Sequence, residues 1–196
     1  MKEINDKKLI IIFTGPSGVG KGTIEKILFN QKDLRLQLSC SATTRKPREG
    51  EIDGQHYFFI TKAQFEESIK NHELLEYSFH FDNYYGTLFR EIDRIHASNN
   101  IPFLEIETEG AKQILLNPIN HEKYKILTFF VSPPTIEDLK NRIKNRNTED
   151  EAAILKRLQK AEQEIADKNH FKYEIINDIP ERAAEEIRNI LKNEIK

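Results

Sequence analysis

Nine consecutive residues near the N-terminus combine glycines, a lysine and a threonine at the spacing of a phosphate-binding loop. They are Gly15, Pro16, Ser17, Gly18, Val19, Gly20, Lys21, Gly22 and Thr23, and they follow directly on the apolar run 9–13. A buried strand that turns through glycines into a helix directs several backbone N–H groups at one point, where the helix dipole also favours an anion. Lys21 adds a mobile positive charge that can follow a phosphoryl group. The segment therefore predicts phosphate binding.

The loop departs from the usual pattern at the residue after the lysine. That position is commonly Ser or Thr, whose hydroxyl binds Mg²⁺, whereas here Gly22 follows Lys21 and Thr23 comes one place later. An ion carried with ATP could then keep more of its waters, with Thr23 near it. The plainer alternative is a glycine-rich turn that binds nothing, but the spacing, the lysine and the strand-to-helix context all favour a phosphate site.

A second group of polar residues suits a phosphate at one end and a base at the other. Arg45 and Arg48 flank Pro47, and such fork-shaped donors match a phosphate dianion. Tyrosine hydroxyls could complete the ring of donors. The members of the group are Ser41, Arg45, Arg48, Tyr57, Glu76, Tyr85 and Thr87.

Glu76 could distinguish between purine bases. Guanine presents N1–H and N2–H side by side, and a carboxylate can accept both, whereas adenine has an acceptor at N1. Unpaired buried polar groups let such a site reject an analogue by factors of about 10⁴ or more. Each residue of this group also has an ordinary explanation as a loop charge, a strand aromatic or a surface carboxylate. Only the combination predicts a nucleotide site.

Short apolar runs alternate with helical patterns along most of the chain. This alternation predicts an α/β fold, with a parallel sheet covered by helices on both faces. Strands are expected at 9–13, 101–106, 124–131 and 173–177, and helices at 21–30, 109–116, around 136–143, around 154–165 and from Pro180 onward.

Residues 39–96 break this rhythm. Period-two runs such as 56–60 are separated by turn-rich segments such as 48–54, which predicts a small, mostly β insertion. The expected organisation is a core at 1–38, a nucleotide-binding insertion at 39–96, core again at 97–139, a helical lid at 140–158, and core at 159–196.

Composition sets modest limits on function. The 196 residues suit one domain with insertions, and 30 basic against 32 acidic side chains indicate neither a nucleic-acid nor an anionic-membrane surface. No apolar stretch approaches the ~20 residues of a membrane span. The single cysteine, Cys40, fits a reducing compartment, so we expect a cytoplasmic protein. The histidines show no metal-ligand spacing, and oligomeric state is left open.

With these residues in view, the chain resembles the guanylate kinases, which transfer the γ-phosphoryl of ATP to GMP. The resemblance covers nearly the whole chain and is most specific at 41–48 and 83–87. It extends through Leu75-Glu76, 104–111, Pro133-Pro134, 142–158 and Asn177-Asp178.

The resemblance implies a role for each matched residue. The phosphate of GMP would be held by Arg45, Arg48, Tyr57 and Tyr85, and its base read by Ser41, Glu76 and Thr87. The loop 15–23 would wrap the ATP phosphates, with Asn177 and Asp178 beside the adenine. Lys21 and Arg45 would act in catalysis together with Arg142, Arg146 and Arg157, which lie on or near a mobile lid. Mg²⁺ would arrive with ATP.

Three short segments depart from the family pattern. Glu105-Ile106-Glu107 replaces Glu-Ile-Asp, so the Glu107 carboxylate, expected with Glu105 at the nucleotide site, is one methylene longer. Thr108-Glu109 replaces an aromatic-glutamine pair, and Asn147 replaces a glycine after Arg146. Two other functions are kept open: a guanylate-kinase-like binding module without activity, and a phosphate-loop kinase for another small acceptor.

Overall fold

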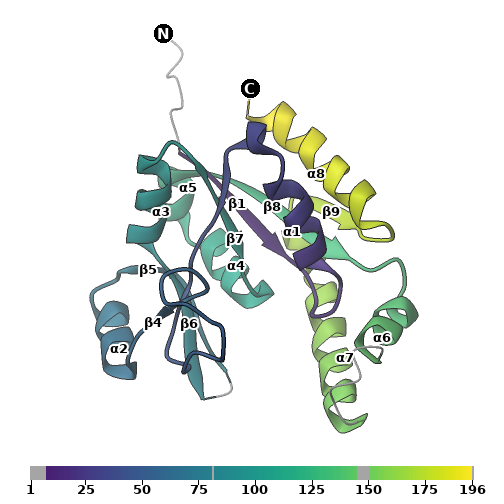
Figure 1. The fold of residues 1–196 in the computed structure, drawn as a ribbon, viewed down its shortest axis with the longest axis horizontal. Coiled ribbons are helices and arrows are strands. Elements are labelled where there is room, and N and C mark those ends of the chain that lie inside the picture. The colour runs from purple at the N-terminus through teal and green to yellow at the C-terminus, as the bar shows by residue number, and fades with distance from the viewer. Residues whose placement is uncertain (1–7, 81, 145–150, 196) are drawn as a thin grey trace. The chain divides into compact units, whose positions relative to one another are not determined.

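The larger sheet of the protein has five strands. In the computed structural model, which describes residues 8–80, 82–144 and 151–195, their order is β2-β7-β1-β8-β9. The strands span Leu36–Leu38 (β2), Ile101–Glu105 (β7), Lys8–Thr14 (β1), Tyr124–Ser132 (β8) and Tyr173–Ile176 (β9) (Figure 1). β8 and β9 run parallel, with Phe129 opposite Tyr173.

The chain divides into two compact units. The first, here called the P-loop unit, comprises Ile11–Leu36, Ile106–Thr108 and Leu127–Lys196. The second, called the insertion unit, comprises Met1–Ile10, Gln37–Glu105 and Glu109–Ile126. The insertion unit thus contains all of the segment 39–96 that the sequence sets apart.

Hydrophobic burial holds the P-loop unit together. Ile11, Ile12 and Phe13 of β1 are 0% exposed, and each such side chain contributes about 1.5–3 kcal/mol when fully buried. Helix α8 (Pro180–Glu194) begins with proline at its first turn and packs against α1 (Lys21–Phe29) (Figure 1). The remaining helices of this unit are η1 (Lys32–Leu34), α6 (Ile136–Lys144), α7 (Glu151–Ala166) and η2 (Lys168–His170).

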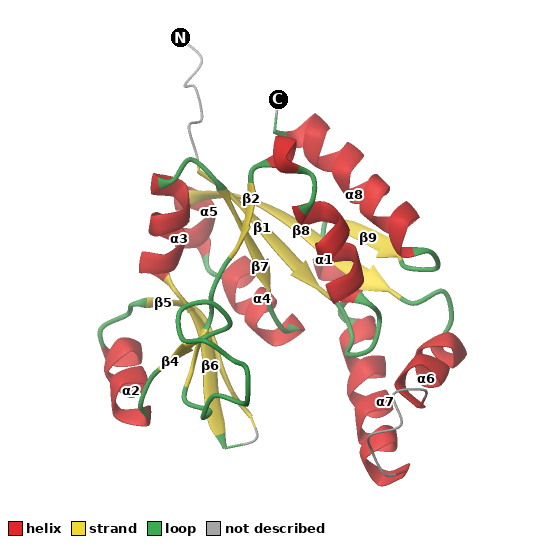
Figure 2. Ribbon diagram, in the orientation of Figure 1, coloured by secondary structure: helices red, strands yellow, loops and turns green. Residues whose placement is uncertain are grey.

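The insertion unit is built around a four-stranded sheet of order β4-β3-β6-β5 (Figure 2). The strands are β3 (Ala42–Thr43), β4 (Phe58–Phe59), β5 (Leu74–His80) and β6 (Asn83–Leu88). Its helices are α2 (Lys62–Lys70), α3 (Phe89–Ala97), α4 (Thr108–Leu116) and α5 (Pro118–Lys123), with Thr108 itself assigned to the P-loop unit. Ala42, Phe65 and Leu88 form a buried cluster where α2 covers the sheet.

The expected α/β fold is confirmed, and the predicted strands and helices outside the insertion agree with the structure to within a few residues at each end. Inside the insertion three details differ. The strand expected at 56–60 is limited to β4, and helices α2 and α3 are not among those predicted. Since Phe65 is the one buried residue of α2, the helix has little hydrophobic periodicity. Its sequence signal is the capping box of Thr61 and Gln64.

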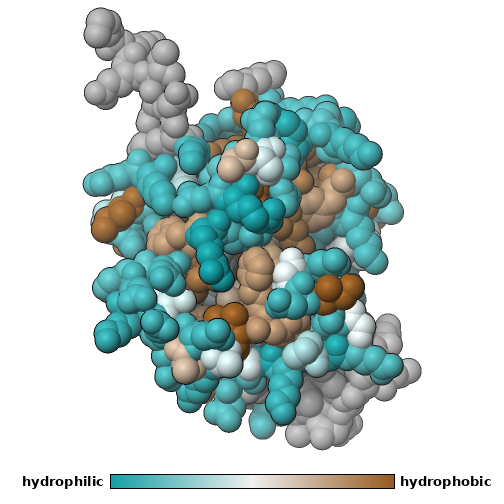
Figure 3. Space-filling model, turned by 60° about the vertical axis from the view of Figure 1, so that its left-hand side comes forward, coloured by the Kyte–Doolittle hydropathy of each residue, from teal (hydrophilic) through white to brown (hydrophobic). Residues whose placement is uncertain are grey.

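The surface carries both polar and apolar side chains. Figure 3 shows a face covered mostly by hydrophilic side chains, interrupted by smaller groups of hydrophobic ones. Within the described ranges, none of the helices combines the length and the apolar character needed to cross a membrane.

Candidate active site

The loop that follows β1 has the backbone geometry of an anion cradle. Gly15 and Gly20 have φ angles of 148° and 104°, in the region that favours glycine. Neither position has room for a side chain. A Cβ at Gly15 would lie 2.4 Å from the carbonyl oxygen of Val131, and one at Gly20 would lie 2.5 Å from Nδ2 of Asn177. Gly20 is also the N-cap of α1, so the loop delivers its backbone to the positive end of a helix.

Lys21 lies along this loop. Its Nζ donates a hydrogen bond to the carbonyl oxygen of Gly15 at 2.7 Å. The ammonium group is therefore held at the loop that the sequence predicts to bind phosphate.

One residue expected at the ATP site, Asn177, and one expected on or near the lid, Arg142, both hold the loop at Val19. The carbonyl oxygen of Val19 accepts from Nδ2 of Asn177 at 2.7 Å and from Nη1 of Arg142 at 2.9 Å. Nη2 of Arg142 also donates to the carbonyl oxygen of Asn177 at 2.8 Å. Asn177 is buried, whereas the carboxylate of Asp178 accepts from the N–H of Ile179 at 2.6 Å and pairs with Arg182.

Helix α7 contacts the loop at Ser17. Nη2 of Arg157 donates to the Ser17 hydroxyl at 2.7 Å. Two turns further along, burial raises the pKa of Glu164, against the opposing effects of Lys160, Lys21 and the backbone N–H of Ser17. Lys160 also donates to the carboxylate of Glu107 at 3.1 Å, within the P-loop unit. Arg146 and Asn147 lie outside the described residues.

Arg45 is the centre of a polar cluster in the insertion unit. Its Nη1 and Nη2 donate to the two carboxylate oxygens of Glu51, both at 2.9 Å, and its guanidinium lies 5.3 Å from the ring centroid of Tyr57. The hydrogen bonds from Arg45 and from the backbone N–H of Arg48 lower the pKa of Glu51 to about 2. The Arg48 side chain is exposed.

The two tyrosines of the predicted phosphate site lie beside this cluster. The ring centroids of Tyr57 and Tyr85 are 6.2 Å apart. The pKa of Arg45 is raised chiefly by its hydrogen bonds to Glu51, and a hydrogen bond with Tyr85 adds to this effect. Burial raises the pKa of Tyr57, Arg45 opposes it, and Tyr85 and Glu105 add to it. Glu105 is therefore near enough to act on the predicted phosphate site.

Two of the predicted base-reading residues, Glu76 and Thr87, lie on paired strands. β5 and β6 are antiparallel, with Glu76 opposite Thr87, and the Thr87 hydroxyl donates to Oε1 of Glu76 at 2.7 Å. Both residues are buried, with Glu76 only 5% exposed. Ser41 precedes β3, and its carbonyl oxygen accepts from the N–H of Phe58 at 2.9 Å. A buried carboxylate with a fixed hydroxyl partner is suited to reading hydrogen-bond donors.

Cys40 is a small buried residue with a free thiol. Burial and then the nearby Glu91 carboxylate raise its pKa to about 11, so the thiol stays protonated. Its backbone N–H donates to Glu91 at 3.1 Å, and Arg94 in turn donates to both carboxylate oxygens of Glu91 at 2.8 Å.

Two carboxylates of these clusters were missed by the sequence interpretation. Glu51 falls in the turn-rich segment 48–54, six residues after Arg45 and three after Arg48. Glu164 lies seven residues after Arg157, a separation that returns to the same helix face. Both spacings can be seen in the sequence, and they indicate that each carboxylate lies near an arginine of the predicted site.

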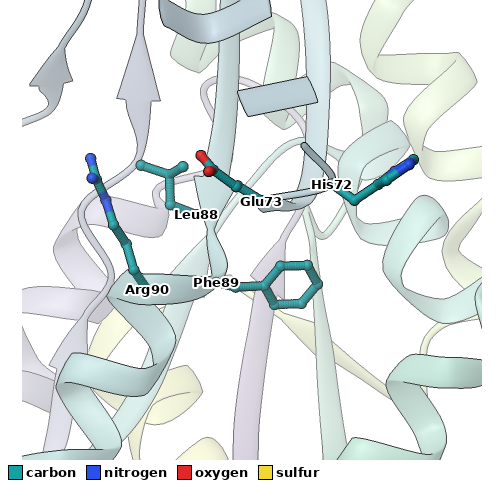
Figure 4. Close-up of a pocket in the computed structure, with 5 residues that line it drawn as sticks. All are labelled: His72, Glu73, Leu88, Phe89 and Arg90. Atoms are coloured by element: carbon teal, nitrogen blue, oxygen red, sulfur yellow. The ribbon is translucent and has the colours of Figure 1, made fainter. Parts of the chain in front are cut away.

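A pocket of about 300 Å³ lies elsewhere in the insertion unit, where β5 begins and β6 passes into α3. It is lined by His72, Glu73, Leu88, Phe89 and Arg90 (Figure 4). The Glu73 carboxylate already accepts from the hydroxyl of Ser68 at 2.9 Å. None of the predicted site residues lines this pocket.

Among the described residues, no group of three or more His, Cys, Asp or Glu side chains is placed to hold a metal ion. Thr23 is exposed in the first turn of α1, two residues from Lys21. One hydroxyl beside a phosphate loop fits an ion held mostly by phosphates and water, because Mg²⁺ gives up its water reluctantly.

Comparison with known proteins agrees with this geometry. The guanylate kinase family model matches residues 6–194. The chain is 56% identical to the guanylate kinase of Mycoplasmopsis synoviae (strain 53), over 96% of each chain, and 53% identical to that of Mycoplasmopsis pulmonis (strain UAB CTIP), over 94% of each. A crystal structure of guanylate kinase from Anaplasma phagocytophilum is 27% identical, with a TM-score of 0.72, over 96% of this chain and 86% of that one. The protein therefore belongs to the guanylate kinase family.

Proposed function

We propose that this member of the guanylate kinase family transfers the γ-phosphoryl group of ATP to GMP, giving ADP and GDP, and that the residues described above divide this work between them. The observation that carries the assignment of GMP is the buried Glu76 carboxylate, held by the Thr87 hydroxyl at 2.7 Å. Guanine offers two adjacent donors to such a group, whereas adenine would set a lone pair against it. The alternative kinase for another acceptor would need different partners at this position.

On the donor side, the loop 15–23 would bind the ATP phosphates through backbone N–H groups and the N-terminus of α1. Lys21 would leave the carbonyl oxygen of Gly15, 2.7 Å away, to follow the phosphoryl group. Arg142 and Asn177 would hold the loop in shape through the Val19 carbonyl, and Arg157 would act through Ser17. On the basis of the sequence, we also propose that Arg146 is a lid residue.

On the acceptor side, Arg45 would bind the GMP phosphate with Arg48, Tyr57 and Tyr85. That phosphate is itself the nucleophile, so a dedicated general base is not required. Phosphoryl transfer passes through a loose transition state, in which positioning and charge neutralisation supply most of the acceleration. The cationic groups would offset the repulsion between two anions brought together. We also propose that Glu105 and Glu107 contribute to GMP binding.

Mg²⁺ is the implied cofactor. When bound with ATP it would supply charge neutralisation at the phosphates, with the Thr23 hydroxyl near it. The nucleotides this reaction uses are those of the cell interior, so we also propose a cytoplasmic location.

The proposed function is tested by measuring ADP and GDP formation from MgATP with GMP, with AMP, or without an acceptor. ADP formed only with GMP, in equal amount to GDP, would establish the kinase. ADP formed equally without an acceptor would mean that water reaches the phosphoryl group, contrary to a site completed by both substrates. GMP binding without turnover would favour the non-catalytic binding module.

A further inference from the structure

Helix α4 lies against the carboxylate that we assign to guanine recognition. Glu76 follows a register irregularity in β5 that begins at Leu74, and it lies opposite Thr87 of β6. Oε1 of Glu76 accepts from Thr87 at 2.7 Å. Its other oxygen, Oε2, faces Gly110 in the first turn of α4.

Gly110 leaves no space for a side chain beside this carboxylate. A Cβ built on Gly110 would lie 2.4 Å from Oε2 of Glu76 and 3.1 Å from its Cδ. The first distance is far inside van der Waals contact. The φ angle of Gly110 is not positive, so its backbone conformation is also accessible to alanine. The absence of a side chain at Gly110 therefore leaves the space that the Glu76 carboxylate occupies.

Helix α4 is also hydrogen-bonded to strand β5 at Tyr77, the residue after Glu76. Nε2 of Gln113 donates to the carbonyl oxygen of Tyr77 at 2.8 Å, and the Tyr77 N–H donates to Oε1 of Gln113 at 3.2 Å. Gln113 lies three residues after Gly110, on the same side of the helix. One side-chain amide thus pairs with both backbone groups of Tyr77, the residue that follows Glu76.

We propose that Gly110 and Gln113 are positioning residues that set the selectivity of this protein for guanine. The inference rests on the proposed function. Thr87 lies against one carboxylate oxygen of Glu76 and Gly110 against the other. The hydrogen bonds of Gln113 to Tyr77 fix the distance from helix α4 to strand β5. A base with two adjacent donors requires two oxygens in one plane, and a displacement of about 1 Å is enough to weaken such an arrangement strongly.

The Gly110→Ala variant tests this proposal. The atom in conflict is the far end of a flexible side chain, so the Glu76 carboxylate should yield while the helix gains a residue of higher helix propensity. We expect an unchanged or higher melting temperature, an unchanged KM for ATP, and a higher KM for GMP. IMP has N1–H but lacks the N2 amino group, so the ratio of kcat/KM for GMP to that for IMP should fall about tenfold or more.

A double-mutant cycle shows whether the effect passes through Glu76. Glu76→Asp shortens the side chain by one methylene and withdraws the carboxylate from the added methyl group. The two changes should therefore be non-additive in kcat/KM for GMP, with the double variant losing less than the product of the two single losses. Additive losses would mean that Gly110 acts by another route and would overturn the proposal.

Gln113→Met provides an independent variant, because it keeps the side-chain volume and removes both hydrogen bonds to Tyr77. It should lower the GMP to IMP ratio in the same direction, whereas Leu116→Ala, at a position 74% exposed on the same helix, should leave it unchanged. If wild-type protein phosphorylates GMP while folded Gly110→Ala and Gln113→Met keep its selectivity, the inference is wrong. If wild-type protein does not phosphorylate GMP, the proposed function itself fails.

Discussion

Arg45 and Glu51 form a two-pronged ion pair in which two guanidinium nitrogens donate to two carboxylate oxygens, both at 2.9 Å. Both side chains are largely shielded, at 16% and 17% exposure. The pair fixes the direction of the arginine that we assign to the GMP phosphate. Glu51 also accepts from the backbone N–H of Arg48 at 2.6 Å, so it joins both arginines of the segment.

Replacement of Glu51 by glutamine should weaken GMP binding. The guanidinium of Arg45 would keep a neutral acceptor but lose its charged partner, so its direction would be less firmly fixed and the KM for GMP should rise by up to about fivefold. We expect kcat and the KM for ATP to change little, as measured by steady-state kinetics with each substrate varied. A lower KM for GMP would instead mean that Glu51 competes with the phosphate. Glu49→Gln, at an exposed neighbouring position, is the control.

The same pair predicts a pH dependence of stability. The pKa of Glu51 falls from its ordinary value of 4.5 to about 2, chiefly through the hydrogen bond from Arg45. Because the folded-state pKa is lowered, the stabilisation is fully present above the ordinary value and is lost as pH falls toward about 2. The difference in melting temperature between wild type and Glu51→Gln should be constant from pH 7 to about 5 and shrink below that range. A difference that grew on acidification would contradict the assignment.

Lys21→Ala should reduce turnover far more than it weakens GMP binding. We assign Lys21 to the transferred phosphoryl group, where charge develops in the transition state, and removal of one such group costs about 10²–10³-fold in kcat. Turnover and GMP affinity are best separated by steady-state kinetics together with calorimetric titration of GMP. Lys26→Ala, at an exposed position of the same helix, should behave as wild type. A change confined to the KM for GMP would remove Lys21 from this role.

Glu76→Gln should reduce the discrimination between GMP and AMP. The variant retains the shape of the side chain but places a donor where guanine needs an acceptor, so the ratio of kcat/KM values should fall by about 10²-fold or more. The ratio is obtained from competition between the two nucleotides at fixed MgATP. Glu66→Gln, on an exposed position of α2, provides the matched control. Unchanged discrimination would exclude Glu76 from base reading.

Much of the P-loop unit was predictable because its elements are strongly patterned. The run 9–13 is continuously apolar and becomes β1, and the spacing of Ala183, Ile187 and Leu191 gives the buried face of α8. Helix α2 was missed, because its stability depends on a capping box and one buried phenylalanine rather than on a repeating apolar face. A capping motif by itself is thus a weaker predictor of a helix than hydrophobic periodicity.

The candidate site was predictable in its residue types but not in its pairings. Arg45, Glu76 and Thr87 could be selected from their chemistry, whereas the pairing of Arg45 with Glu51 depends on how one turn folds back on itself. The contact of Gly110 with Glu76 joins residues 34 positions apart (110 − 76) and depends on a helix crossing a strand. A glycine inside a helical pattern is a signal of close approach, but it does not name the neighbour.

Glu164 provides a last prediction, because the protein carries a carboxyl group where burial disfavours its charge. Burial raises the pKa of this group, with Lys160, Lys21 and the Ser17 N–H opposing it. A raised folded-state pKa means that stability is lost as pH rises through that pKa. Glu164→Gln should therefore melt at a higher temperature than wild type at pH 7, and the gain should disappear on acidification, as followed by thermal denaturation across pH. Glu162→Gln, exposed on the same helix, should show neither effect. A lower melting temperature at pH 7 would mean that the attraction to Lys21 and Lys160 outweighs the cost of burial.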